Sequence, residues 1–530
     1  MFIKRTRDGS KDNPYYYIQL VHSYRDKKGY PRHKVIMTLG REDKINIDKL
    51  STDIIKTLSK LTKSLIVFDK NKDSMKDVLL LGPIIAIESI WKKLNLDKII
   101  DEVKKNYNIS FNLPNATKLM VMNRLLDPKS KLSIMNWKKK IYSQDFDDIE
   151  LQHLYRTLDI LAENKDLLQK RLFETTQSLF KPKIRLVFYD LTTIYFESQM
   201  QDVLRRFGYS KDNKTDCVQV VLAFAVDENN IPICYEMFPG NTYEGHTVES
   251  LIKRLKEDFE IEKVVVVGDK GILSDKVLSD LEGAGLEYIV SAKLNQLPKK
   301  YHKEITDKSS YKDLGNGLLA KELEVKGRRL VLCYSEKRAQ RDSATREETL
   351  NRLSKKLKAD PKSLTASPTY RRYLRIEKYK AFIDESKVEE QSKWDGFYGF
   401  YTNAVDLSPE KVVDAYHSLW QVEESFRCMK STLDLRPVYH WTEKRIEGHV
   451  MMCFMSFYVL RVMQKFWSDY GLTLSPERAM ELLSEVVVTE VKAGDKLYHI
   501  RTEIAGEVNQ LLRSLGCKIP STVLEENVVE

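Results

Sequence analysis

Two aspartates and one glutamate stand where three carboxylates could share one reaction site. Asp190 follows the apolar run "RLVFY" and Asp269 follows "VVVVG", so each comes at the end of a segment typical of a buried strand. Ligands of open α/β sheets bind beyond the carboxyl ends of the strands. Glu423, in the stretch "YHSLWQVEESFRCMK", lies on an expected helix and could join the two aspartates. Neighbouring carboxylates repel one another, and bound Mg²⁺, which prefers hard oxygen ligands, removes that cost.

Such an acidic cluster fits phosphodiester chemistry. Two divalent ions about 4 Å apart can activate a nucleophile and stabilise the leaving oxygen. Each aspartate also has an ordinary interpretation, because an Asp after a strand is most often a turn former or a helix cap. The three contexts taken together, rather than any single residue, favour a metal site.

A helix from Pro409 to Lys430 must position the glutamate. Ser408 is a good N-cap, and proline suits the first helical position. No Gly or Pro interrupts the segment before Pro437, so the sequence predicts one continuous helix.

Four polar side chains share one stripe of this helix at about 100° per residue: Tyr416, Glu423, Arg427 and Lys430. The neighbouring Glu424 points further into solvent on the same projection. An ordinary solvated helix edge shows the same pattern of charges. Two interpretations therefore stay open: a solvated edge, or a row of side chains beside a reaction site.

A sheet must bring the two aspartates together. From residue 181 the chain alternates expected strands with expected helices. This alternation predicts an α/β layer, with helices packed on a mixed sheet. Residues 300–395 change character, with a hairpin and a highly charged helix, and form an insertion before the Glu423 helix. The expected strands are "KIRLVFYD", two strands around "DENN" within 216–240, "EKVVVVGDKG", and "LEYIVSA".

The flanking regions have features of DNA-binding modules. Residues 14–40 are predicted to form two strands around the turn "DKKG". This basic hairpin with interleaved tyrosines could lie on DNA phosphates, or it could simply be solvated. Residues 75–178 show apolar residues at helical spacing, which suits helix-turn-helix modules and equally any helical bundle.

Composition excludes several classes of protein. With 42% hydrophobic and 31% charged residues, the chain can bury cores and is not a disordered polymer. The formal charge of +10 permits a polyanionic partner without requiring one. No apolar run approaches 20 residues and the N-terminus has no apolar signal core, so neither a membrane span nor secretion is expected. Six scattered cysteines without a CxxC pair indicate neither zinc knuckle nor disulfide framework, and the cytoplasm is expected.

Three segments together resemble the acidic motifs of DDE transposases of the insertion-sequence four superfamily: "VFYDLTTIYFES", "VVVVGDKGILS" and "YHSLWQVEESFRCMK". That family spaces its third motif as Y-x2-R-x3-E-x6-K, which Tyr416, Glu423 and Lys430 match. Leu419 stands at the arginine position, and Lys270 follows the second aspartate where many relatives have arginine. Stretches such as "RPVYHWTEKRIEGHV" are similar to the long-chain subgroup, so the resemblance extends over residues 10–465.

The resemblance implies an α/β fold with an RNase H-like catalytic core and a mostly β insertion domain. A β-hairpin and a helical N-terminal region would precede that core. The implied domains are a basic β-hairpin region (1–50), a helical DNA-binding domain (51–180), the catalytic core (181–299 and 396–465), the insertion (300–395) and a C-terminal helical tail (466–530).

The resemblance also implies roles for individual residues. The catalytic, metal-binding set would be Asp190, Asp269 and Glu423. Tyr416 and Lys430 would hold DNA phosphates near the cut, for which lysine is well suited as a point charge. Arg427 on the same stripe and Lys270 beside the second aspartate are further candidates for DNA binding.

The implied activity is that of an insertion-sequence DNA transposase. Two Mg²⁺ (or Mn²⁺) ions per active site would serve cleavage at the element ends and then transfer of the freed 3′-hydroxyl into target DNA. The expected partners are terminal inverted repeats and target DNA, bound by a homodimer, with no membrane. The expected location is cytoplasmic, nucleoid-associated when bound. Trp394 could stack on a flipped base, although a core tryptophan fits its context better.

Two other functions stay open at this point. A structure-specific nuclease could use the same metal site without strand transfer. A non-catalytic DNA-binding protein derived from a transposase is a third possibility, against which the three intact carboxylates argue.

Overall fold

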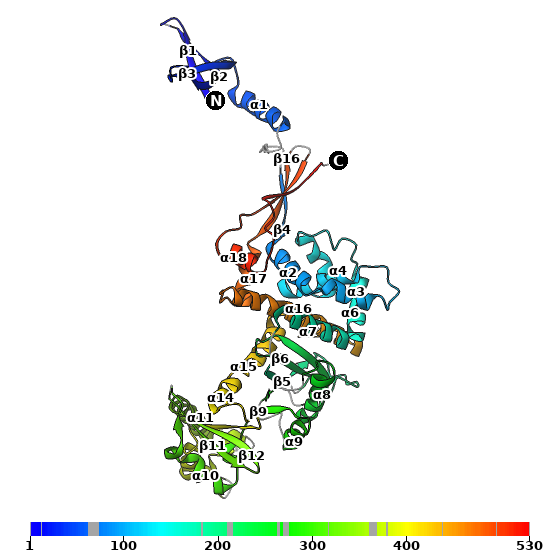
Figure 1. The fold of residues 1–530 in the computed structure, drawn as a ribbon, viewed down its shortest axis with the longest axis vertical. Helices are drawn as coiled ribbons and strands as arrows, with labels where there is room; N and C mark the ends of the chain where they lie inside the picture. Colours follow the sequence, from blue (N-terminus) through cyan, green and yellow to red (C-terminus); the bar gives the residue numbers. More distant parts are fainter. Residues whose placement is uncertain are drawn as a thin grey trace. The chain divides into compact units, whose positions relative to one another are not determined.

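The structure is a computed structural model, and its chain divides into two compact units (Figure 1). It describes residues 2–11, 13–61, 74–181, 184–208, 216–261, 265–268, 275–315, 317–359, 368–377, 380–436, 438–493 and 496–528. Unit 1 comprises Met1–Val78, Val487–Glu503 and Pro520–Glu530, and unit 2 comprises Leu79–Val486 and Ile504–Ile519.

A three-stranded antiparallel sheet begins unit 1. The predicted hairpin is confirmed, and Asp26 closes its turn, since its Oδ1 accepts hydrogen bonds from the N–H groups of Lys28 and Tyr30 at 2.9 and 3.0 Å. The first strand, which pairs with the second, was not predicted from the sequence. The elements are β1 (Phe2–Gly9), β2 (Pro14–Arg25), β3 (Pro31–Arg41) and the helix α1 (Ile47–Leu61).

The prediction of a wholly helical tail over 466–530 is wrong. The tail contributes three strands to a four-stranded sheet whose fourth strand comes from the region expected to be helical. The run "VVVTEV" explains the error, because its β-branched residues favour a strand, with Val488 and Val491 buried. The sheet order is β18 (Val523–Val528), β17 (Lys496–Arg501), β16 (Val487–Ala493) and β4 (Ser74–Leu80).

Unit 2 contains the predicted mixed sheet, which has nine strands. β5 pairs antiparallel with β6 and parallel with β8, which in turn pairs parallel with β9. Apolar side chains from β5 to β9 and from α8 (Glu244–Glu257) and α9 (Asp275–Gly283) form one buried cluster. The order is β10 (Lys312–Asp313), β11 (Leu318–Val325), β12 (Arg328–Ser335), β15 (Phe397–Thr402), β9 (Glu287–Ser291), β8 (Val265–Gly268), β5 (Leu186–Tyr195), β6 (Gln219–Asp227) and β7 (Pro232–Pro239).

The range 300–395 differs from the mostly β insertion that we expected. Its first strands continue the core sheet, because β12 pairs with β15 through partners such as Leu330 and Tyr401. Its longest element is α11 (Glu336–Ala359), a helix of 24 residues whose dense charge suits an exposed face. The range is therefore mixed α and β. Its other elements are α10 (Lys299–Thr306), α12 (Pro368–Arg371), β13 (Leu374–Glu377), β14 (Lys380–Ile383) and α13 (Glu385–Ser392).

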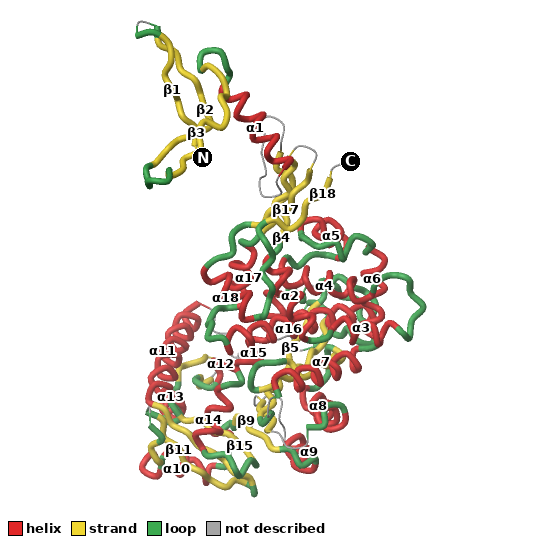
Figure 2. The backbone as a smooth tube through the Cα atoms, turned by 45° about the horizontal axis from the view of Figure 1, so that its top comes forward, coloured by secondary structure: helices red, strands yellow, loops and turns green. Residues whose placement is uncertain are grey.

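A helical layer packs around α16 (Glu443–Asp469), and Figure 2 shows α2, α4 and α6 beside it. A Cβ on Gly448 would lie 2.0 Å from the carbonyl oxygen of Leu158, so glycine lets α16 approach α6 closely. Among the described residues α16 alone is long and apolar enough to resemble a membrane span, but 94% of its apolar window is buried, as in a core helix. The other helices are α2 (Gly82–Lys93), α3 (Leu96–Lys104), α4 (Leu113–Leu126), α5 (Lys131–Trp137), α6 (Leu151–Glu163), α7 (Lys165–Phe180), α17 (Pro476–Ser484) and α18 (Gly506–Ser514).

Lys131, at the start of α5, is buried against α16. Its Nζ lies 3.6 Å from the Sδ of Met452, and burial together with the positive charge of Arg124 lowers its pKa from 10.5 to about 7. Between these two values the unfolded chain binds one proton more than the folded chain. The contribution of Lys131 to stability is therefore fully present above pH 10.5 and is lost as the pH falls to 7.

Lys131→Met is expected to raise the melting temperature at pH 7 and to flatten its rise between pH 7 and 10. The methionine keeps much of the packing volume without placing a charge in the interior. Thermal unfolding over a series of pH values measures this, with the exposed Lys139→Met as the matched control. A lower melting temperature at every pH would contradict the expectation.

Candidate functional site

Asp190 lies in the middle of β5, half-buried, and not at the end of the strand as predicted. The strand continues because residues 191–195 keep pairing with β6, down to Tyr195 opposite Gln219. Asp190 itself is paired with Phe224 of β6. Directly paired residues of neighbouring strands place their side chains on the same face of a sheet, so Asp190 and Phe224 share a face.

The face of the sheet that carries Asp190 is the one covered by α15 (Trp420–Arg427). The ring of Phe224 lies 5.8 Å from that of Phe426 in α15 and 5.6 Å from that of Phe457 in α16. Glu423 precedes Phe426 by three residues in α15, and its side chain is exposed. The structure therefore brings Asp190 and Glu423 to the same side of the sheet.

The predicted Asp269 and Lys270 lie outside the described residues. The last described residue before them is Gly268, at the end of β8. Among the described residues, no group of three His, Cys, Asp or Glu side chains is close enough to hold a metal ion. Two of the three predicted carboxylates, Asp190 and Glu423, belong to the described part.

The helix predicted over Pro409–Lys430 is divided into three parts. They are α14 (Pro409–His417), α15 and the π-helix η4 (Cys428–Thr432). Hydrogen bonds at the first break join residues three apart, from the N–H of Leu419 to the oxygen of Tyr416 at 3.0 Å, and this spacing is tighter than in an α-helix. A projection on one regular helix therefore does not describe how Tyr416, Glu423 and Lys430 lie relative to one another.

The predicted DNA-contacting side chains of this segment differ in their surroundings. Tyr416 is half-buried, with its ring 4.4 Å from that of Phe400 in β15. Arg427 is exposed on α15, whereas Lys430 is half-buried in the π-helix. Leu419, at the position of the family arginine, is buried, so this position belongs to the core and not to a phosphate-binding surface.

Glu424 does not point into solvent as predicted. It forms an ion pair with Arg461 of α16, and the two side chains are 19% and 5% exposed. It also accepts a hydrogen bond of 3.2 Å from Nδ2 of Asn230, whose Oδ1 accepts one of 2.7 Å from Ser425. Tertiary packing keeps Glu424 out of solvent, because α16 places Arg461 on this side of α15. The network fixes the rotation of α15 about its axis and leaves Glu423 exposed.

Two tryptophans bear on the site, and only one of them was predicted from the sequence. Trp420, three residues before Glu423, is 58% exposed, and a tryptophan one turn from the glutamate was the available signal. Trp394 is half-buried in the insertion, with its ring edge-on to His302 at 4.9 Å, and its stacking on a base stays a prediction.

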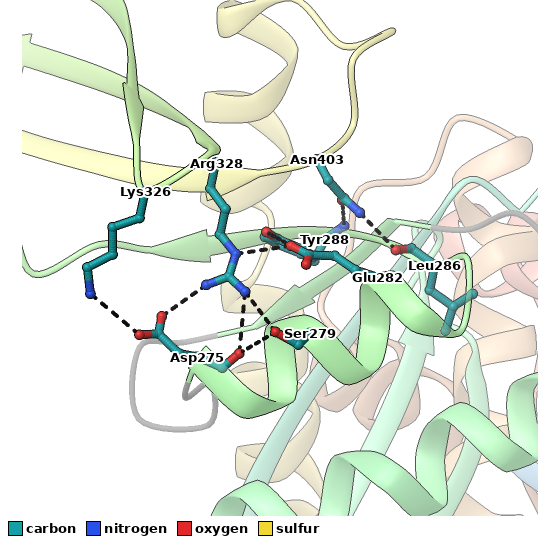
Figure 3. Close-up of polar contacts among 8 residues, drawn as sticks. All are labelled: Asp275, Ser279, Glu282, Leu286, Tyr288, Lys326, Arg328 and Asn403. Carbon is teal, nitrogen blue, oxygen red and sulfur yellow. Dashed lines mark hydrogen bonds and ion pairs between the residues drawn. The ribbon is translucent and has the colours of Figure 1, made fainter.

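Arg328 fastens the insertion to α9, the helix that follows the second acidic motif (Figure 3). Its guanidinium donates to Asp275 at 3.0 Å, Ser279 at 3.0 Å and Glu282 at 3.1 Å. These acceptors stand at i, i+4 and i+7 of α9, so one planar side chain spans two turns. The adjacent Arg329 donates to the carbonyl oxygens of Ala404 and Leu407, before α14, and the two arginines tie β12 to both flanks of the site.

Arg328→Ala is expected to loosen the β11–β12 hairpin from α9. The change leaves two carboxylates without their shared partner, and because Asp275 and Glu282 are 74% and 37% exposed, each pair contributes only about 0–1 kcal/mol. Hydrogen–deuterium exchange should rise in residues 275–283 and 318–335. Arg328→Lys should recover only part of the protection, because lysine cannot span the three acceptors. Unchanged exchange in the alanine variant would refute this role.

Comparison with known families identifies the class to which the chain belongs. Residues 181–459, slightly more than half of the 530-residue chain, match the family described as a transposase DDE domain. Residues 3–66 match the N-terminal domain of the IS1634 family of transposases. A comparison with curated proteins finds no match. The chain therefore belongs to the DDE transposases of insertion sequences.

Proposed function

We propose that this chain cuts DNA at the ends of its insertion sequence and joins the freed 3′ ends to target DNA. The observation that carries the proposal is the placement of Asp190 and Glu423 on one side of the sheet, within a matched DDE domain. The strand arrangement supports an RNase H-like core: β5, β6 and β7 form an antiparallel meander, and β8 and β9 run parallel to β5.

The proposed metal ligands are Asp190, Asp269 and Glu423. Asp269 is included in the proposed site because of its position in the sequence. Phe188 and Val267 are strand partners, Asp190 follows Phe188 by two residues, and Asp269 follows Val267 by two residues. The donor set fits the ion, because carboxylate oxygens are hard ligands and the exposure of Glu423 leaves room for the waters that Mg²⁺ retains. Two Mg²⁺ or Mn²⁺ ions held there would supply Lewis-acid chemistry at the phosphodiester.

The surrounding side chains would position DNA. Arg427 is exposed four residues after Glu423, where its guanidinium can bind a phosphate with two hydrogen bonds. Lys430 would add a point charge, and Tyr416 a hydroxyl, further along the same strand of DNA. Lys270, outside the described residues, is proposed as a phosphate contact beside Asp269.

The other regions would recognise and assemble the DNA. We assign the terminal inverted repeats to the matched N-terminal domain and to the helical region up to residue 180, which contains α2 to α7. A homodimer holding two element ends is the proposed assembly. The protein would act in the cytoplasm, in contact with the nucleoid while it is bound to DNA.

The test is a strand-transfer assay with the full chain, labelled DNA carrying both element ends, a target plasmid and Mg²⁺. Cleavage at the element boundary followed by joined products is the expected result. Cleavage without joining would replace the proposal with a structure-specific nuclease. Binding without cleavage, under both Mg²⁺ and Mn²⁺, would make the chain a DNA-binding relative.

A further inference from the structure

Exposed aromatic and apolar side chains gather where β5 ends. Tyr439 is 74% exposed and Trp441 63%, on the segment that leads from η4 into α16. The chain that follows β5 exposes three more large apolar side chains: Met200, Val203 and Phe207. Large exposed apolar side chains gathered in one region mark binding surfaces. We call these five residues, with Arg206 and Arg436, the β5-end surface.

Backbone and ring contacts bring the two segments of the β5-end surface together. Tyr195, the last residue of β5, pairs with Gln219, whose backbone exchanges hydrogen bonds of 2.9 and 3.1 Å with that of Arg206. The Arg436 guanidinium lies 5.5 Å from the Tyr195 ring centre, and that of Arg205 lies 5.5 Å from the Trp441 ring centre. Both segments therefore lie beyond the last residues of β5, in the direction in which the parallel β8 also runs.

The exposed rings are held outward by buried neighbours. Exposure alternates along the segment, with Val438 buried and Tyr439 and Trp441 exposed, while the His440 ring lies 5.4 Å from the buried ring of His449. Arg205, which supports Trp441, is itself buried and paired with Asp202 at 2.6 Å. Rings fixed in this way lose little conformational freedom when a ligand binds.

We propose that the β5-end surface binds unpaired bases of a DNA strand that runs from the cleavage site. Aromatic rings stack on bases of any sequence, and arginines bind the phosphates between them. In a duplex the bases stack on one another, so rings at a protein surface engage bases that have left the helix. The chemistry of the β5-end surface therefore favours a single strand over intact duplex.

The position of the β5-end surface fits this substrate. Tyr195 follows Asp190 by five residues on one strand, about 16 Å at roughly 3.3 Å per residue. A DNA strand carries one phosphate per ~3.4 Å of duplex axis, so a few nucleotides cover this distance. The inference rests on the proposed function for the origin of the strand, whereas binding by the rings can be measured without cleavage.

The test compares the full chain with Tyr439→Ala/Trp441→Ala in EDTA, at one salt concentration, using a labelled single-stranded oligothymidylate and a duplex of equal length. Loss of each ring is expected to weaken single-strand binding about 5- to 160-fold, so the double variant should lose at least about 25-fold, with duplex binding nearly unchanged. Tyr439→Phe/Trp441→Phe should retain single-strand affinity, since the rings remain. Tyr470→Ala, at the end of α16 and 56% exposed, is the matched control and should bind like the parent.

Three results would overturn the inference. One is a double alanine variant that binds the single strand as tightly as Tyr470→Ala. Another is equal weakening for the single strand and the duplex. The third is a change from dimer to monomer in sedimentation with unchanged single-strand affinity, which would make the β5-end surface a contact between two copies of the chain. Failure of the proposed function is separate, because it appears as absent cleavage by the parent in Mg²⁺.

Discussion

Glu423→Gln should abolish Mg²⁺-dependent cleavage of element-end DNA while DNA binding persists. The amide keeps the size of the side chain but loses the negative charge that a hard cation requires. Loss of an outer-shell partner of a metal site costs about 10- to 100-fold in affinity or activity, so loss of a direct ligand should exceed that range. Nicking of end-labelled DNA under Mg²⁺ and Mn²⁺, beside a gel-shift measurement of binding, gives both readouts.

The matched control for this change is Glu410→Gln. Glu410 is also an exposed glutamate, in the first turn of α14, and the proposed site does not include it. The Glu410→Gln variant should cleave element-end DNA like the parent protein. Because Glu423 is exposed, its variant should melt at the parent temperature. Cleavage by Glu423→Gln within a fewfold of the parent would remove this residue from the metal site.

Glu424→Ala, one residue further along, should instead destabilise unit 2. Removing one partner of a buried ion pair leaves the other charge uncompensated, which typically costs about 3–5 kcal/mol. Here the remaining charge is Arg461, only 5% exposed, and Asn230 also loses its acceptor. Differential scanning calorimetry should show a lower transition temperature for unit 2. Proteolysis within residues 409–432 should be faster than in the parent protein.

Glu481→Ala serves as the control for the second prediction. Glu481 forms an exposed pair with Arg478 at 2.7 Å, and exposed pairs contribute only about 0–1 kcal/mol. The double variant Glu424→Ala/Arg461→Met should recover part of the lost stability, since no buried charge remains unpaired. Equal melting temperatures for Glu424→Ala and Glu481→Ala would show that the pair does not fix α15.

Local patterns were sufficient for most strands of the core. The apolar run before Gly268, the two runs around "DENN" and the hairpin that became β11 and β12 were all predicted from a few neighbouring residues. Each pattern is complete within one strand or one turn, so no distant partner is needed to recognise it. The end of β5 was misjudged because Asp190 interrupts an apolar run that continues through "LTTIY".

Features that depend on distant partners could not be predicted. The sequence around Glu424 predicts a solvated residue. In the structure the packing of α16 places Arg461, 37 residues later in the chain, beside it. The break at Leu419, where hydrogen bonds join residues three apart, has no Gly or Pro to announce it in the sequence. The common face of Asp190 and Glu423 required the register of β5 with β6 and the contact of Phe224 with Phe426.

The pairing of β4 with β16 has a consequence for the order in which the molecule forms during synthesis. β4 ends at Leu80 and β16 begins at Val487, so a ribosome must add about 400 residues before the partner of β4 exists. Strands so far apart in the chain also pay a larger loop-closure entropy and pair late. The sheet of β1–β3 and the nine-stranded sheet, whose strands are all translated before β16, can thus fold first, and the four-stranded sheet closes as a final step of maturation.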